Sequence, residues 1–180
     1  MWDVQTTEIL RFVSLVLVSL SMGVHFGTWL VEAPIRETRS GPLFTEVHQG
    51  RDRVAARVMP FLGNAAIVSV AVCVYLVKAV PGAFWLALLG LLFLIGDMAV
   101  TLTGNVPINK EVQSWNVAAP PPSWLRLRDR WEKFHTLRTV LIVMGFTLFA
   151  SSVVFLKVSE GGFRFLGLRR LRQQSRVYRI

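Results

Sequence analysis

The chain has 180 residues, the length of one domain, and its composition points to a membrane environment. Hydrophobic residues make up 53% of the chain and charged residues only 17%, against about 25% charged in an ordinary soluble domain. A net charge of +9 would suit a nucleic-acid-binding protein, but the Lys and Arg residues lie almost entirely between and after the apolar runs. Lipid headgroups can meet them there, so we expect a lipid bilayer, and no nucleic acid, as partner.

Four apolar segments are each long enough to cross a hydrocarbon layer of ~30 Å. They cover residues 9–31, 58–80, 84–103 and 137–158. In lipid such segments must be helices, because every backbone polar group has to be hydrogen-bonded within its own segment. We therefore predict an all-α fold, a four-helix transmembrane bundle that occupies residues 1–158.

The links between these segments differ in length. Only a few residues join the second and third segments, where Pro81-Gly82 indicates a tight turn, so these helices should form an antiparallel hairpin. The other two links, residues 32–57 and 104–136, are much longer. A four-span topology places both on the same side, so we expect two long polar loops on one membrane face and any polar site beside them.

Residues 159–180 form a basic tail. Basic residues decide the orientation of a membrane protein, and here they are divided almost evenly between the two faces. We favour a multi-pass protein of a bacterial inner membrane with this tail in the cytoplasm. The tail could lie on an anionic membrane surface as a short amphipathic helix, or serve as a disordered anchor.

Asp97 is a costly residue within the third segment, because a carboxylate at the centre of a membrane helix costs roughly 3 kcal/mol. It should therefore face the bundle interior, and Thr101 and Asn105 follow near the same helical face. Asp97 could belong to a functional site, or it could hydrogen-bond a neighbouring helix and fix the packing.

Two asparagines, Asn105 and Asn109, lie around the proline that should end the third helix. Pro107 lacks a backbone N–H, and the amides could satisfy backbone groups that are freed at a helix end. This local account does not explain why Glu111 and Trp115 follow so closely at the membrane edge.

The start of the fourth segment carries a second polar motif. Trp131, His135 and Arg138 are spaced four and three residues apart, so they share one helical face. Trp and Arg are expected at any membrane interface. A neutral imidazole, in contrast, suits proton transfer near pH 7, which makes His135 a candidate catalytic residue.

A third polar group contains His25, Glu32 and His48. His25 and Glu32 lie seven residues apart, which is two turns on one helical face, and all three histidines of the chain lie toward the same membrane side. A His/carboxylate site for iron or copper is chemically feasible. The spacing contains no His-x3-His or Glu-x-x-His repeat, so a hydrogen-bonded polar network is the plainer alternative.

Two of these motifs resemble a known family. The segment from Gly104 to Val112, followed by Trp115, and the segment from Arg130 to Thr139 are similar to the polar motifs of the membrane family that includes the fungal and bacterial anthrone oxygenases. The resemblance covers most of residues 10–157. Characterised members oxidise an anthrone to an anthraquinone with dioxygen and, as generally described, need no added cofactor.

The resemblance implies roles for the polar residues. His135 would be the base that removes a proton from the acidic carbon of a lipophilic substrate, Asn105, Asn109 and Arg138 would stabilise the oxyanion, and two indoles would sandwich the rings. His25 is not a feature of the family, which keeps a metal-dependent oxygenase open. The candidates are His135, Asn105, Asn109, Arg138 and Asp97 for catalysis, Trp115 and Trp131 for substrate binding, and His25, Glu32 and His48 for a metal.

Two classes of function therefore remain. The first is a membrane oxidoreductase that acts with dioxygen on a lipophilic aromatic or polyketide-like molecule. The second is a non-catalytic membrane subunit or assembly partner, in which the polar residues only join the helices and the basic tail docks onto a larger complex. A transporter is less favoured, because the four segments show no inverted repeat, although a homo-oligomer could supply further sites.

Overall fold

A computed structural model describes the backbone of residues 4–177 and the side chains of residues 5–154. Within these residues the chain is helical and contains no strand. The elements are α1 (Val4–Gly27), η1 (Thr28–Glu32), α2 (Ala33–Glu37), α3 (Gly41–Leu76), α4 (Pro81–Val100), η2 (Thr101–Asn105), α5 (Val106–Gln113) and α6 (Trp124–Val177), where η denotes a π-helical segment.

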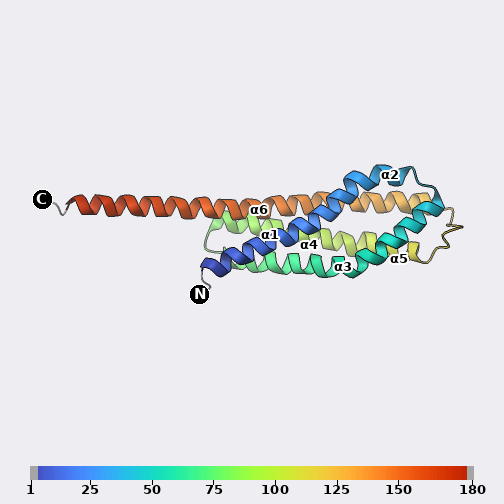
Figure 1. The fold of residues 1–180 in the computed structure, drawn as a ribbon, viewed down its shortest axis with the longest axis horizontal. Helices are drawn as coiled ribbons and strands as arrows, with labels where there is room; N and C mark the ends of the chain where they lie inside the picture. The colour runs from blue at the N-terminus through green and yellow to red at the C-terminus, as the bar shows by residue number, and fades with distance from the viewer. Residues whose placement is uncertain (1–3, 178–180) are drawn as a thin grey trace.

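These elements join into four helical runs, each long and apolar enough to cross a membrane: Gln5–Glu37, Gly41–Leu76, Pro81–Gln113 and Trp124–Val154. The predicted all-α, four-helix fold is thus confirmed, and it is compatible with an integral membrane protein. The four runs lie alongside one another, and both long links meet at one end of the bundle (Figure 1). The start of α1 and the α3–α4 turn lie at the opposite end, beyond which α6 continues (Figure 1). The side chains of the basic tail lie outside the described residues.

The two long links are mostly helical, where loops were expected. Only residues 38–40 and 114–123 lie outside the helices there. The second of these breaks contains Pro120, Pro121 and Pro122, which cannot continue a helix because they lack backbone N–H donors. In the short hairpin the turn is formed by residues 77–80, and Pro81 begins α4, a position where a missing donor costs nothing.

Three prolines, Pro34, Pro60 and Pro107, lie within the helical runs without ending them. Pro34 and Pro107 each follow a π-helical segment by two residues, and the helix continues through α2 and α5 respectively. A proline removes one backbone hydrogen bond and crowds the carbonyl four residues earlier. That carbonyl lies inside η1 for Pro34 and inside η2 for Pro107, so the wider π turn accommodates each proline. The third helix was expected to end at Pro107, but it continues through α5.

The apolar core lies between the spans and is small, because only 22–28% of the residues in the most apolar part of each run are buried. Large apolar side chains such as Phe12 and Phe61 are exposed, as lipid-facing residues are. Two of the spans, α4 and α6, approach each other closely. A Cβ added to Gly90 would lie 3.0 Å from the carbonyl oxygen of Gly145 and 3.0 Å from the backbone nitrogen of Phe149. Small residues of this kind let membrane helices pack backbone to backbone.

Gly90→Ala should therefore separate α4 from α6 and lower the free energy of unfolding by about 1–3 kcal/mol, the usual cost of overpacking. Thermal unfolding in mild detergent measures this effect. Gly23→Ala is the matched control, because a Cβ there would meet nothing within 4 Å. Equal unfolding temperatures for the two variants would contradict the close approach.

Candidate functional site

A cavity of about 570 Å³ opens between α1, α3, α5 and α6, near the end of the bundle where the long links meet. Its size falls within the range of roughly 300–1,000 Å³ that small-molecule sites occupy. All four helical runs contribute lining residues, the third only through Asn109 of α5: Val24, His25, Thr28, His48, Gly50, Arg51, Asp52, Val54, Ala55, Val58, Met59, Asn109, Trp131, His135 and Arg138.

His135 lies on the inner wall of this cavity, between two other rings. Its imidazole stacks on the Trp131 ring, with a centroid distance of 4.8 Å and an interplanar angle of 24°. The His25 ring lies 6.1 Å away on a nearly parallel plane. The residue is buried, yet neither Nδ1 nor Nε2 has a hydrogen-bond partner among the described residues. Buried polar atoms are rarely left unpaired, so this imidazole is available to a ligand or a water molecule.

Arg138 is held by two neighbours at the same wall. Its Nε donates to the Oδ1 of Asp97 at 2.9 Å, and its Nη2 donates to the Nε2 of His25 at 2.5 Å. Because arginine can only donate, the Nε2 of His25 must be the acceptor. The His25 proton is therefore on Nδ1, which donates to the carbonyl of Ser21 at 2.8 Å. Asp97 faces the interior, as predicted, and is itself buried.

Asn109 lies at the centre of a second network. Its Nδ2 donates to Asp52 at 2.7 Å, and its Oδ1 accepts from the Nε1 of Trp131 at 2.7 Å. Since Asp52 only accepts and the indole only donates, the orientation of the amide is fixed by its partners. The same Oδ1 lies 3.1 Å from the Nε2 of His48, which must then be the donor. The network holds Trp131 against His135.

The cavity has aliphatic side chains on its exposed side, in contrast to its buried polar wall. Val24 on α1 and Val54 and Val58 on α3 line it, and each is more than half exposed on the outer surface of the bundle. Val24 and Val58 also belong to the predicted membrane spans. A cavity with an aliphatic opening at the level of the spans can admit a molecule that is dissolved in the lipid.

The two π-helical segments contribute directly to this region. Thr28, the first residue of η1, lines the cavity. Asn105, the last residue of η2, is buried and donates from Nδ2 to the carbonyl of Trp131 at 3.2 Å. Gly104 precedes it, and a Cβ there would lie only 2.7 Å from the Phe134 ring. The absence of a side chain at Gly104 thus lets α6 approach η2.

The cavity brings together six of the ten predicted site residues: His25, His48, Asn109, Trp131, His135 and Arg138. Asn105 and Asp97 lie one contact behind its wall, through Trp131 and Arg138. Trp115 does not line it. Trp115 packs against the cluster of Ile108, Val112, Leu127 and Trp131, so only one of the two predicted indoles lines the cavity.

The three residues suggested for a metal are only partly gathered. His25 and His48 line the cavity together with His135. Glu32 does not, and its carboxylate is paired with Arg39 at 3.0 Å and Arg51 at 3.3 Å. Among the described residues, no group of three or more His, Cys, Asp or Glu side chains could hold a metal ion.

Sequence reasoning did not identify two arginines near this site. Arg51 lines the cavity and donates to Thr28 at 3.3 Å, and it follows His48 by three residues, so helical spacing on α3 could have revealed it. Arg36 lies over the Trp131 ring, with its guanidinium carbon 4.5 Å from the centroid, and pairs with Glu132. No spacing signal predicts that pair, because its members lie 96 residues apart.

The protein is thus a four-helix bundle of the membrane-spanning type with a polar cavity. A tryptophan, a histidine and an arginine of α6 form part of the wall of that cavity. The family model for anthrone oxygenase matches residues 52–148, which is more than half of the chain, and the chain belongs to this family. The matched region includes His135, Arg138 and Asn109, whereas His25 and His48 lie before it. Searches of curated proteins and of solved structures give no match.

Asn109→Ala should remove the support of Trp131 and leave His48, Trp131 and Asp52 without this partner. We expect the free energy of unfolding to fall by about 2 kcal/mol or more, since each buried polar group that is left unpaired costs about 1–3 kcal/mol. Thermal unfolding in detergent is the measurement. Asn116→Ala is the control, because Asn116 bonds only its own exposed turn. An Asn109→Ala variant as stable as this control would show that the network contributes nothing.

Proposed function

We propose that this chain is a membrane-embedded oxygenase that oxidises a lipophilic, flat aromatic molecule of the anthrone type with dioxygen. The family supports an oxygenase-like role, and the cavity supports a proton transfer to His135. The observation that carries the proposal is the pair of unpartnered nitrogens on a buried imidazole that lines the cavity. A neutral imidazole with a free lone pair is the base that this chemistry needs.

The reaction begins with loss of a proton from the CH₂ carbon opposite the carbonyl of the anthrone. His135 takes this proton, and the electron pair is delocalised onto the carbonyl oxygen as an enolate. The enolate transfers two electrons to dioxygen with formation of a C–O bond, and the peroxide oxygen takes back a proton. Loss of water from this hydroperoxide leaves the second carbonyl. One oxygen atom enters the product and the other leaves as water, so dioxygen is the only oxidant required.

Arg138 is the residue placed to stabilise the enolate oxygen. Its Nε and Nη2 are held by Asp97 and His25, which fixes the guanidinium and leaves Nη1 for a ligand in the cavity. A preorganised cation beside a developing negative charge lowers the barrier without reorganisation. Both Nδ2 and Oδ1 of Asn109 already bond protein partners, Asp52 and Trp131. We therefore assign Asn109 a positioning role, in which it holds Trp131 against His135.

His135→Gln should abolish base catalysis while it keeps a polar side chain of similar size. We expect anthrone-dependent dioxygen uptake by the purified protein in detergent to fall roughly 100-fold or more. Arg126→Gln is the control on the same helix, because Arg126 is exposed and does not line the cavity. Uptake at the wild-type rate by a folded His135→Gln variant would refute the role of His135. Uptake that requires added iron or copper would assign the chemistry to a metal.

The route of the substrate can be tested at the mouth of the cavity. Val54→Trp should narrow the opening and raise KM several-fold with a smaller effect on kcat, since the indole obstructs entry but not the proton transfer. Val68→Trp is a matched control, because both valines lie on α3 with 63% exposure and only Val54 lines the cavity. Steady-state dioxygen uptake with anthrone measures both constants. Equal KM values for the two variants would exclude entry at this mouth.

A further inference from the structure

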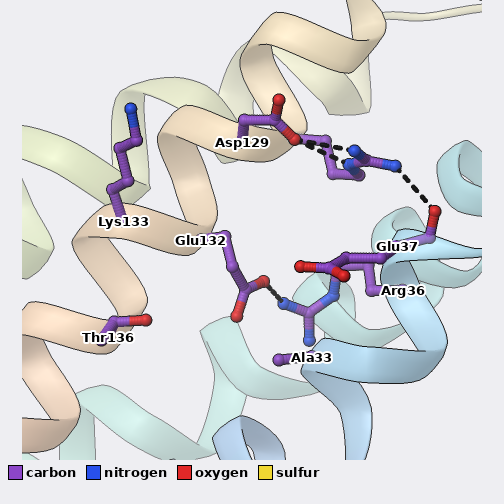
Figure 2. Close-up of a pocket in the computed structure, with 8 residues that line it drawn as sticks. Ala33, Arg36, Glu37, Asp129, Glu132, Lys133 and Thr136 are labelled. Atoms are coloured by element: carbon purple, nitrogen blue, oxygen red, sulfur yellow. Dashed lines mark hydrogen bonds and ion pairs between the residues drawn. The ribbon is translucent and has the colours of Figure 1, made fainter.

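A second cavity, of about 560 Å³, lies between α2 and the first part of α6 (Figure 2). It shares no lining residue with the site described above. It is lined mainly by charged side chains, three of each sign. The cations are Arg36, Arg128 and Lys133, and the anions are Glu37, Asp129 and Glu132. No role in the proposed oxidation involves this cavity, so its polar lining needs a separate explanation.

The central pair of this cavity is incompletely bonded. Arg36 is only 2% exposed, and its Nη1 donates to the Oε2 of Glu132. The other ends of both groups, Nη2 of Arg36 and Oε1 of Glu132, are buried and have no partner among the described residues. Figure 2 shows the two side chains facing each other across the space between α2 and α6. A ligand that bonds both free atoms must accept one hydrogen bond and donate another.

The remaining charges extend this pattern outward. Arg128 is engaged by Asp129 at 2.8 Å and by the carbonyl of Glu37 at 3.1 Å. Lys133 and the carboxylate of Glu37 are exposed, and no described residue forms an ion pair with either. The cavity therefore offers one free donor and one free acceptor in its central pair, and its lining also includes one cation and one anion without an ion-pair partner among the described residues. A ligand with one positive and one negative group matches this arrangement better than a simple anion or cation does.

The position of the cavity indicates the source of such a ligand. Its α2 residues follow the first predicted span directly, and its α6 residues precede the fourth, so the cavity lies at the edge of the hydrocarbon layer. Leu30, Ile35 and Leu137 are close to it in sequence, and each is about half exposed. Phospholipid headgroups occupy this level of a membrane, and exposed apolar side chains can contact their acyl chains.

We propose that this cavity binds the headgroup of a zwitterionic phospholipid that carries a primary ammonium group. The phosphate accepts hydrogen bonds from Nη2 of Arg36 and from Lys133. The ammonium donates to Oε1 of Glu132 and to the carboxylate of Glu37. The acyl chains follow the apolar surface of α1 and α6. The inference does not depend on the proposed oxidation, because it uses different residues apart from the contact between Arg36 and Trp131.

The test is thermal unfolding of the full chain in detergent, with three added probes. Phosphatidylethanolamine should raise the unfolding temperature in a saturable way. Phosphatidylcholine with the same acyl chains should be far less effective, because its trimethylammonium group has no N–H to donate. Soluble phosphoethanolamine tests the headgroup without chains. Equal effects of the two lipids, or an equal effect of phosphoethanolamine, would overturn the proposal, and no effect of any probe would mean that the cavity holds only water.

Variants locate the effect in this cavity. Lys133→Gln and Glu37→Gln remove exposed charges without an ion-pair partner, so both should fold, and each should weaken phosphatidylethanolamine binding roughly threefold. Glu132→Gln alters the buried acceptor and should weaken it roughly tenfold or more. Arg126→Gln and Glu46→Gln make the same charge changes at exposed positions outside the cavity. Unchanged binding by Lys133→Gln and Glu37→Gln, judged against these controls, would refute the site.

Discussion

The structure depends on one constraint: a backbone that crosses lipid must hydrogen-bond to itself, so its helices cannot simply stop at a proline. Pro34 and Pro107 each remove a donor from a helical run, and the π-helical segments before them absorb the defect. The helices then continue out of the apolar region and form the walls of the polar end of the bundle. Thr28 of η1 thereby lines the cavity. Asn105 of η2 lies behind the cavity wall and bonds the backbone carbonyl of Trp131.

Hydrogen bonds hold most of the polar side chains that line the first cavity, although Oδ1 of Asn105 behind its wall has no partner among the described residues. Asp97 and His25 hold Arg138, and Asn109 holds Trp131 through a single amide oxygen. Burial of such groups is tolerable only when they are bonded. Against this background His135 differs from its neighbours, since both of its ring nitrogens lack a partner among the described residues. Of the residues that line this cavity, His135 alone has buried side-chain nitrogens without a partner among the described residues, which leaves its imidazole for something that enters the cavity.

Local patterns in the sequence were sufficient for the four spans, the hairpin, the inward position of Asp97, and the shared face of Trp131, His135 and Arg138. Hydropathy and helical spacing act over a few residues, so they can be read from one segment. The continuation of the third helix beyond Pro107 depends on α6, because Asn105 bonds the carbonyl of Trp131 and Gly104 admits the Phe134 ring. Contacts between distant segments, such as that one, leave no local pattern.

Polar contacts, in addition to its close packing against α4, hold α6 against the first helical run. Between membrane helices there is no hydrophobic driving force, because lipid is as apolar as the side chains. The first helical run instead bonds α6 at successive turns, through Arg36 to Glu132, Trp29 to Thr136 at 3.1 Å, and His25 to Arg138. His135 lies on α6 between Glu132 and Arg138, so its position is flanked by these contacts. The proposed base thus lies between bonds that belong to both cavities.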